Sequence, residues 1–169
     1  MSGAYRADLP KSPPDFRILR GKTNEVMIRI YEATEPSDLL AEAFARLLPQ
    51  LSERMTAPDR EAVARIVASP ATRQLVAAAE DGRIVGLLSV ALYDVPSGRK
   101  AWIEDVVVDA AARGRGIGEA LVREALALAC REGVARVMLT SNATRRAAHR
   151  LYERMGFVRY ETDCFRLDL

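Results

Sequence analysis

The stretch from Val106 to Glu119 reads Val-Val-Val-Asp-Ala-Ala-Ala-Arg-Gly-Arg-Gly-Ile-Gly-Glu. Its three β-branched residues, preceded by Trp102 and Ile103, predict a strand that is covered on both faces. After the glycines, apolar residues recur at helical spacing: Leu121, Val122, Ala125, Leu126, Leu128 and Ala129. The stretch is therefore predicted to form a strand, a glycine-rich loop and the start of a helix.

This arrangement is suited to holding a phosphate group. The free N–H groups at the start of a helix and the positive end of its dipole point at one place, and glycines let a bulky anion touch the main chain. Two common phosphate loops do not match. The dinucleotide loop needs a glycine where Glu119 stands, and the Walker loop needs a Gly-Lys-Ser/Thr ending that is absent here. A tight structural turn is the alternative interpretation.

Length and composition indicate one globular domain. The chain has 169 residues, 49% hydrophobic and 28% charged, which is enough to bury a core. No apolar run reaches membrane-spanning length and no basic start leads into an apolar segment, so a cytoplasmic protein without membrane contact is expected. Cys130 and Cys164 lack CxxC spacing, which favours free thiols, and the single histidine leaves too few ligands for a zinc site. No metal is expected.

The charge is small overall but unevenly distributed. A net charge of +2 argues against a general nucleic-acid binder. Between Arg113 and Arg154, however, nine arginines face only four glutamates. This excess is typical of a solvated helical surface, and around a phosphate loop it would also attract a polyanionic ligand.

The remaining patterns predict the order of the elements. Residues 1–25 contain three prolines and no sustained apolar period, and are interpreted as an extension outside a domain that spans residues 26–169. Asp81-Gly82 predicts a hairpin turn, and Pro49 is expected to close the first helix. Helices are expected at 39–48 and 59–69, from the glycine-rich loop to a stop at Gly133, and at 144–155. Strands are expected at 26–31, 74–80, 83–93, 100–108 and 135–140, the last parallel to the central strand, with one or two more at 157–160 and 164–169.

A second motif, together with the order of the elements, indicates a known family. Residues Ala148 to Phe157 read Ala-His-Arg-Leu-Tyr-Glu-Arg-Met-Gly-Phe, which resembles the Ala-x-x-x-Tyr-Glu-x-x-Gly-Phe signature of the GNAT superfamily of N-acetyltransferases. Arg-x-x-Gly-x-Gly, beginning at Arg113, is similar to the pyrophosphate loop of that superfamily. The resemblance implies an α/β fold with a mixed, mostly antiparallel sheet, a splayed pair of parallel strands and about four flanking helices. It also implies acetyl-CoA as the acyl-donor co-substrate.

The resemblance assigns candidate residues to the cofactor. The loop amides would hold the pyrophosphate, and a bulge or splay in the central strand would offer N–H groups to the thioester carbonyl. Many family members have an asparagine where this chain has Arg145, so either Asn142 or Arg145 would replace its hydrogen bond, or Arg145 would meet a phosphate. The cofactor-binding candidates are Val106, Val107, Val108, Arg113, Gly114, Arg115, Gly116, Ile117, Gly118, Glu119, Asn142 and Arg145.

Acyl transfer to an amine needs a base and an acid. Tyr152 is the candidate acid for the leaving thiolate, with a core tyrosine as the alternative. Glu104 is the candidate base, directly or through water, with a salt-bridged strand carboxylate as the alternative. Strand alternation places Asp105 on the opposite face from Glu104, so that only one of them is expected to serve the acceptor. His149 is assigned a surface or packing role.

Two functions from different classes fit these residues. The first is an N-acetyltransferase that acts on a primary amine by direct transfer, and the second is a non-catalytic sensor that binds acyl-CoA through the same loop. The acceptor stays open among small amines, amino acids, antibiotics and protein termini or lysines, and so does the length of the acyl group. A homodimer through residues 157–169 is a further expectation, since family members commonly pair there.

Overall fold

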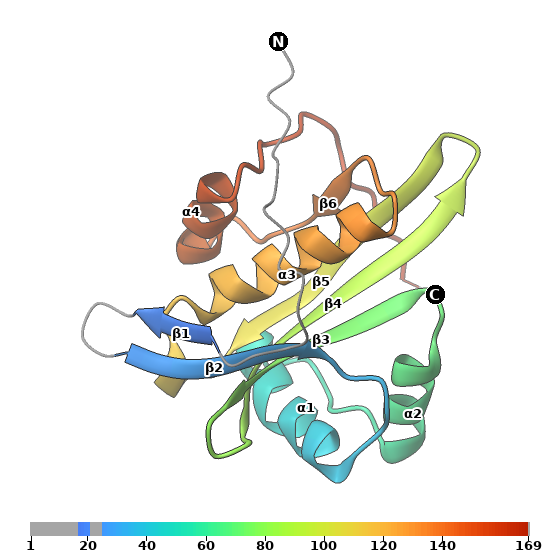
Figure 1. Ribbon diagram of the computed structural model, residues 1–169. Helices are drawn as coiled ribbons and strands as arrows, with labels where there is room; N and C mark the ends of the chain where they lie inside the picture. Colours follow the sequence, from blue (N-terminus) through green and yellow to red (C-terminus); the bar gives the residue numbers. More distant parts are fainter. Residues whose placement is uncertain (1–16, 21–24, 169) are drawn as a thin grey trace.

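The computed structural model describes residues 17–20 and 25–168, and their strands form one sheet (Figure 1). The strands follow one another across the sheet in chain order, and every neighbouring pair is antiparallel except the last, β5 with β6, which is parallel. Their bounds are β1 Arg17–Arg20, β2 Glu25–Glu32, β3 Thr72–Ala79, β4 Ile84–Val95, β5 Gly98–Val108 and β6 Val137–Leu139.

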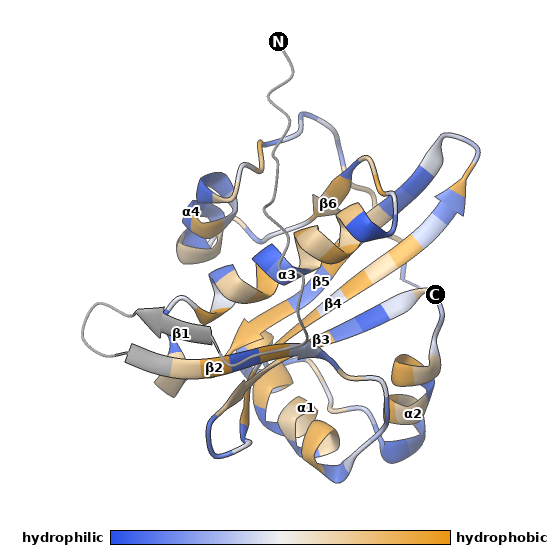
Figure 2. Ribbon diagram, in the orientation of Figure 1, coloured by the Kyte–Doolittle hydropathy of each residue, from blue (hydrophilic) through white to orange (hydrophobic). Residues whose placement is uncertain are grey.

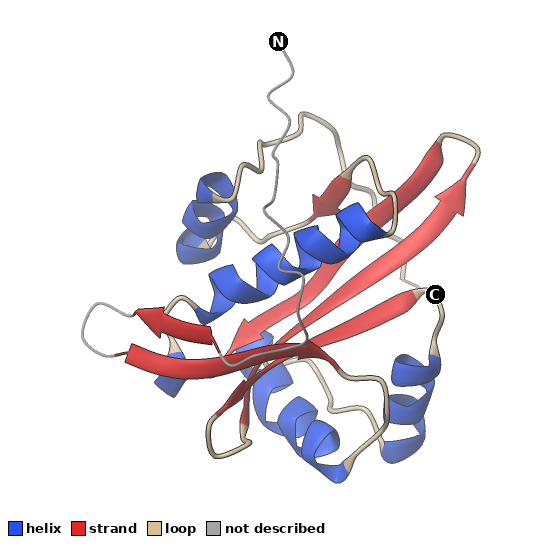
Figure 3. Ribbon diagram, viewed as in Figure 1, coloured by secondary structure: helices blue, strands red, loops and turns tan. Residues whose placement is uncertain are grey.

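Helices cover both faces of the sheet (Figures 1 and 3). Helices α1 and α2 lie on one face, while α3 lies on the other with α4 beside it. Their bounds are α1 Asp38–Leu51, α2 Arg60–Ala68, α3 Ile117–Arg131 and α4 Arg146–Arg154, and a short 3₁₀ helix, Ala110–Ala112, precedes α3. The mixed sheet and its four α-helices in the described ranges confirm the predicted fold class.

The sheet separates two apolar clusters, and the central strands are accordingly the most hydrophobic in Figure 2. Because side chains alternate along a strand, Leu75 and Leu88 pack under α3 while Val76 and Leu87 pack against α1. At Gly86 a Cβ atom would lie 3.0 Å from the Leu121 Cδ1 atom, so glycine is what lets α3 approach β4 this closely.

Local signals set most of the boundaries. The Ser37 side chain accepts from the Leu40 N–H at 3.2 Å and the Asp59 side chain from the Ala62 N–H at 2.7 Å, as expected for helix caps. The prediction that Pro49 closes the first helix was wrong, because α1 continues to Leu51. A proline in the last turn removes only one hydrogen bond, and the helix still ends on the bond from the Ser52 N–H to the Leu48 carbonyl.

The two ends of the chain depart from the prediction. β1 lies within the expected extension and pairs with β2, whereas residues 1–16 and 21–24 lie outside the described part. The strands expected at 157–160 and 164–169 were wrong over residues 157–168, which form neither helix nor strand; Leu169 is not described. An alternating pattern makes a strand only when a neighbouring strand supplies hydrogen bonds, and β6 has only three paired residues.

Candidate active site

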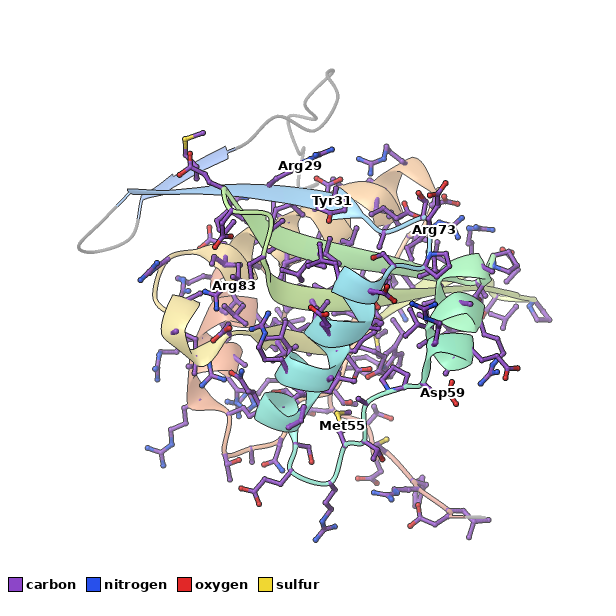
Figure 4. The ribbon with its side chains drawn as sticks, turned by 90° about the horizontal axis from the view of Figure 1, so that it is seen from below. Arg29, Tyr31, Met55, Asp59, Arg73 and Arg83 are labelled. Carbon is purple, nitrogen blue, oxygen red and sulfur yellow. The ribbon has the colours of Figure 1, made fainter. Side chains whose placement is uncertain are left out.

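A cleft of about 760 Å³ opens where β5 and β6 separate. The parallel pairing of these strands ends at Ile103 and Leu139, so the segments beyond diverge. The walls come from the end of α1 and the segment after it, where Figure 4 labels Met55, from β5, from the β6–α4 junction, from α4 and from the C-terminal segment. The lining residues are Leu51, Ser52, Met55, Ile103, Glu104, Asp105, Val106, Thr140, Ser141, Asn142, Thr144, Arg145, Tyr152 and Cys164.

A bulge in β5 shapes one wall. Leu87 pairs with Val107 and Ser89 with Glu104, so Asp105 and Val106 together face the single residue Leu88 of β4. Asp105 has a φ of 51°, the only positive φ of a non-glycine residue in the described ranges. The bulge breaks strand alternation, and Glu104 and Asp105 both line the cleft. The prediction that they point to opposite faces was therefore wrong.

The pKa values of both carboxyl groups are raised. Burial raises the pKa of Glu104, the charge of Asp105 raises it further, and a hydrogen bond with the Trp102 side chain lowers it. Burial also raises the pKa of Asp105. A carboxylate with a raised pKa is a stronger base, so Glu104 is suited to accepting a proton from an amine.

Tyr152 lies in the opposite wall, on α4. Its ring meets the Phe157 ring edge-on, with the centroids 5.8 Å apart. Both rings pack against the apolar cluster between the sheet and α3, the α3-side cluster. Burial raises the pKa of Tyr152, while the charge of Arg145 lowers it. The phenol therefore stays protonated at neutral pH and can donate a proton into the cleft.

Arg145 and Asn142 are the two proposed substitutes for the family's asparagine. Both line the cleft, but both already make hydrogen bonds within the protein. The Arg145 guanidinium donates to the Leu51 carbonyl and so connects the start of α4 to the end of α1. The Asn142 Oδ1 atom accepts from the Thr144 N–H at 3.0 Å and from its hydroxyl at 2.9 Å, which fixes the turn before α4.

Ser141 is a cleft residue that the sequence interpretation missed. Its hydroxyl oxygen is buried and has no hydrogen-bond partner in residues 17–20 and 25–168. The available signal was its position two residues after the apolar run of β6, because the carboxyl ends of parallel strands commonly carry ligand-binding residues. His149, in contrast, is half-buried and does not line the cleft.

The glycine loop lies beside the cleft, at the end of β5. Gly114 and Gly116 adopt left-handed conformations with φ of 76° and 78°, and residues Arg113 to Gly116 are exposed. No side chain caps the start of α3, and Cβ atoms at these two glycines would meet nothing within 4 Å. An open cradle with uncapped helix amides fits the pyrophosphate of acetyl-CoA.

Close packing connects the loop to the cleft. A Cβ atom on Gly118 would lie 3.4 Å from Leu151 of α4 and 3.7 Å from Val108 of β5. Val107, in contrast, is buried towards α1, so the cleft-lining part of β5 ends at Val106. Glu119 pairs with Arg123 at 2.9 Å on the outer side of α3.

The loop is anchored to α1 at its beginning. Asp109 is 7% exposed; it accepts from the Ala111 N–H at 3.1 Å and from the Arg46 guanidinium. The Gln50 side-chain oxygen accepts from the Ala110 N–H at 2.8 Å. Arg83, labelled in Figure 4, adds a second positive charge 3.8 Å from the Asp109 carboxylate. The helix that borders the cleft thereby holds the start of the loop.

Comparison with known families agrees with this geometry. A family model described as the acetyltransferase (GNAT) family matches residues 27–157. The chain belongs to this family. The match spans both sequence motifs and every lining residue of the cleft except Cys164, and it confirms the predicted acetyltransferase class.

Named relatives transfer acetyl groups to different acceptors. The chain is 35% identical over 158 residues to glucosamine 6-phosphate N-acetyltransferase 1 of Oryza sativa subsp. japonica, covering 89% of this chain and 92% of the relative. It is 33% identical over 91 residues to mycothiol acetyltransferase of Renibacterium salmoninarum, covering 53% and 27%. The crystal structure of a Trypanosoma brucei acetyltransferase superposes with a TM-score of 0.69 at 30% identity, covering 84% of this chain and 99% of the other.

Neither a metal site nor a membrane-spanning helix occurs in the described ranges. No cluster of three His, Cys, Asp or Glu residues there could hold a metal ion. No helix in the same ranges has the length and apolar character needed to cross a membrane.

Proposed function

We propose that this protein transfers an acetyl group from acetyl-CoA directly to a primary amine in a ternary complex. The observation that supports the proposal is that Glu104 and Tyr152, a carboxylate and a phenol with opposite proton-transfer roles, line one cleft beside the glycine loop. Neither residue alone would distinguish an enzyme from a binding protein, but the pair supplies both proton transfers of the reaction.

The donor binds along the end of β5 in this proposal. The amides of Arg113 to Glu119 hold its pyrophosphate, and the excess of arginines from Arg113 to Arg154 attracts the polyanion. β6 stops pairing with β5 at Ile103, so backbone groups beyond that point are available on the open edge of β5. Val106, in the bulge, is the residue best placed to stabilise the thioester carbonyl.

In the proposed reaction, protons leave the amine nitrogen and one proton reaches the coenzyme A thiolate. Glu104 takes one proton from the ammonium group, directly or through water, and releases it to solvent, so that the amine nitrogen can attack the thioester carbon. After attack, Glu104 accepts the second proton that this nitrogen must lose. The negative charge that develops on the carbonyl oxygen is stabilised by backbone N–H donors. When the carbon–sulfur bond breaks, Tyr152 donates its phenolic proton to the thiolate and is later reprotonated from water.

The acceptor class is a primary amine that reaches the cleft as an ammonium ion. Glu104 and Asp105 attract such a cation, and Glu104 removes the proton that must leave before attack. Glucosamine 6-phosphate is the amine named for a relative of which this chain covers 92%. We include it first in the panel below, without excluding amino acids or peptide amines.

A panel assay tests the proposal. Release of free thiol from acetyl-CoA is measured with glucosamine 6-phosphate, single amino acids, an aminoglycoside, and peptides with a free N-terminus or lysine. At least one amine should raise thiol release well above the rate without acceptor, and mass spectrometry should find that amine acetylated. Tight acetyl-CoA binding with no acceptor-dependent release would support the non-catalytic sensor instead.

A further inference from the structure

A row of polar side chains crosses the centre of the sheet and ends at Glu104. Gln74 of β3 is the register partner of Ser89 of β4, and Ser89 is the partner of Glu104 of β5, on three adjacent strands (Figure 1). Partners in an antiparallel pair point to the same face, with Cβ atoms about 4.5–5.5 Å apart. That face is the one covered by α1, because Val76 and Leu87, each two residues along from a member of the row, pack there.

Hydrogen bonds fix the direction of the Gln74 side chain, which is only 2% exposed. Its amide nitrogen donates to the Leu75 carbonyl at 3.2 Å and to the Leu88 carbonyl at 3.3 Å. Its amide oxygen accepts from the Ser89 hydroxyl at 2.8 Å. A hydroxyl has one hydrogen and two lone pairs. Ser89 therefore has no hydrogen left for Glu104, and towards that side chain it can act only as an acceptor.

Trp102 presents the opposite kind of group to Glu104. It lies two residues earlier on the same face of β5 and makes a side-chain hydrogen bond with Glu104, in which an indole can only donate. This donor stabilises the ionised carboxylate. An acceptor stabilises the protonated carboxyl group instead, since only that form has a hydrogen to donate. A base that takes up a proton and later releases it benefits from both neighbours.

We propose that Gln74 and Ser89 are positioning residues for Glu104: the Ser89 hydroxyl accepts a hydrogen bond from the Glu104 carboxyl group once that group has taken a proton from the amine. Gln74 keeps the Ser89 oxygen in its accepting state by holding the hydroxyl hydrogen. The inference rests on the proposed function for the source of the proton, but the hydrogen bond itself can be tested in the free protein. Neither residue lines the cleft or belongs to a sequence motif.

Other ionisable groups also face Glu104 across the cleft. The charged or titratable lining residues are Asp105 of β5, Arg145 before α4, Tyr152 of α4 and Cys164 of the C-terminal segment. The wall from the end of α1 and the segment after it adds none among the described lining residues. A substitution at Ser89 leaves all of these groups in place, so a change in the protonation of Glu104 would report the lost acceptor.

The test uses Trp102, the only tryptophan of the chain, as a fluorescent probe of Glu104. The free protein is titrated with acid, and the step in emission that disappears in Glu104→Gln is assigned to Glu104. Ser89→Ala should lower the midpoint of that step by about 0.5 to 1 pH unit, as for one uncharged hydrogen bond to the protonated form. Ser89→Thr keeps the hydroxyl and should keep the wild-type midpoint. So should Ser69→Ala, a matched change at a hydroxyl that donates to the Thr72 hydroxyl at 3.4 Å.

A second substitution protects the test against a misfolded variant. Ser89→Cys nearly keeps the size of the side chain, and its thiol is a weak acceptor, so its midpoint should also fall. An unchanged or raised midpoint in Ser89→Ala and Ser89→Cys would overturn the proposal. A wild-type titration that Glu104→Gln leaves unaltered would overturn it as well, because Trp102 would then not contact Glu104.

Turnover separates this inference from the proposed function. On an accepted amine, Ser89→Ala should lower kcat about 2- to 10-fold and leave coenzyme A affinity unchanged, because the residue acts through Glu104 and not on the donor. If wild type acetylated no amine at all, the proposed function would fail, while the fluorescence titration would still decide whether Ser89 accepts from Glu104.

Discussion

Tyr152 has a packing role and a proposed chemical role that one substitution separates. Its ring contacts Phe157 and the α3-side cluster, and only its hydroxyl is assigned to proton donation. Tyr152→Phe should fold and bind acetyl-CoA as wild type does, because the ring is kept. We expect kcat to fall roughly 10- to 100-fold, the weak end of general-acid effects, since a coenzyme A thiolate is a good leaving group. Full turnover on an accepted amine would mean that Tyr152 is only a core residue.

Asp105 combines a left-handed backbone with a partly buried charge. Its raised folded-state pKa means that protonation favours folding: this contribution is fully present below the unfolded pKa and is lost as pH rises through the folded pKa. Asn tolerates the same φ without the charge. Asp105→Asn should therefore raise stability at neutral pH, by no more than about 0.5 kcal/mol because solvent screens this half-buried group, with the difference shrinking as pH falls towards 4.

Denaturant unfolding at several pH values measures this effect. Asp94→Asn is the control, since Asp94 carries an exposed ion pair with Arg99 at 2.9 Å and its loss should give no gain at neutral pH. An Asp105→Asn variant that is less stable than wild type at neutral pH would show that the carboxylate stabilises the bulge, contrary to our interpretation.

At the scale of elements, the anchor between α1 and the glycine loop holds the start of the loop against the helix that borders the cleft. Asp109 binds the Arg46 guanidinium and the Ala111 N–H, so Asp109→Ala leaves the Ala111 N–H without its acceptor and the Arg46 guanidinium with only the Ile84 carbonyl. We expect a loss of about 2–3 kcal/mol in the free energy of unfolding. Asp94→Ala, which removes a surface pair, should cost under about 1 kcal/mol. Equal losses in urea unfolding would contradict a special role for the anchor.

Whether an element could be predicted from the sequence depends on how far apart in the chain the residues that determine it lie. The helix starts beside Ser37 and Asp59 and the turn at Gly82 depend on neighbours within a few residues, and the sequence predicted both helices and the turn. The bulge at Asp105 depends on the register between β4 and β5, which no local pattern records. Alternation therefore misplaced the Asp105 carboxylate, and the only local signal for Ser141 was its position just beyond the apolar run of β6.

The terminal strands failed for the same physical reason. Residues 157–168 have a strand-like composition, but they have no neighbouring strand within the described part of the chain. Glu104 and Tyr152 both line the cleft, because the fold brings β5 and α4 together there. Their chemical roles stay predictions, as do the roles of the loop residues.

At the scale of the whole molecule, the C-terminal segment exposes several large apolar side chains to solvent. Val158, Tyr160, Phe165 and Leu167 are 64 to 91% exposed. We expect a homodimer in which this segment of one copy contacts the other, because apolar groups of this size are normally covered. Light scattering at micromolar concentration should give the mass of a dimer. Cytoplasmic location also remains a prediction.

Substitutions can connect the dimer to this segment. Phe165→Lys combined with Leu167→Lys should give a monomer, whereas Leu39→Lys, at a 44% exposed position on α1, should leave the dimer intact. A monomeric wild type would contradict the expectation, and a dimer that survives the double substitution would place the interface elsewhere.

The central claim is that the glycine loop holds acetyl-CoA, and calorimetric titration of three proteins tests it most directly. Gly116 and Gly82 have nearly equal φ values of 78° and 81°, and both face open space, so aspartate at either position imposes similar backbone strain. Wild type and Gly82→Asp should bind acetyl-CoA equally, while Gly116→Asp, which places a carboxylate at the pyrophosphate site, should bind roughly tenfold more weakly or worse. Equal affinity of all three proteins, or no binding by wild type, would contradict the account.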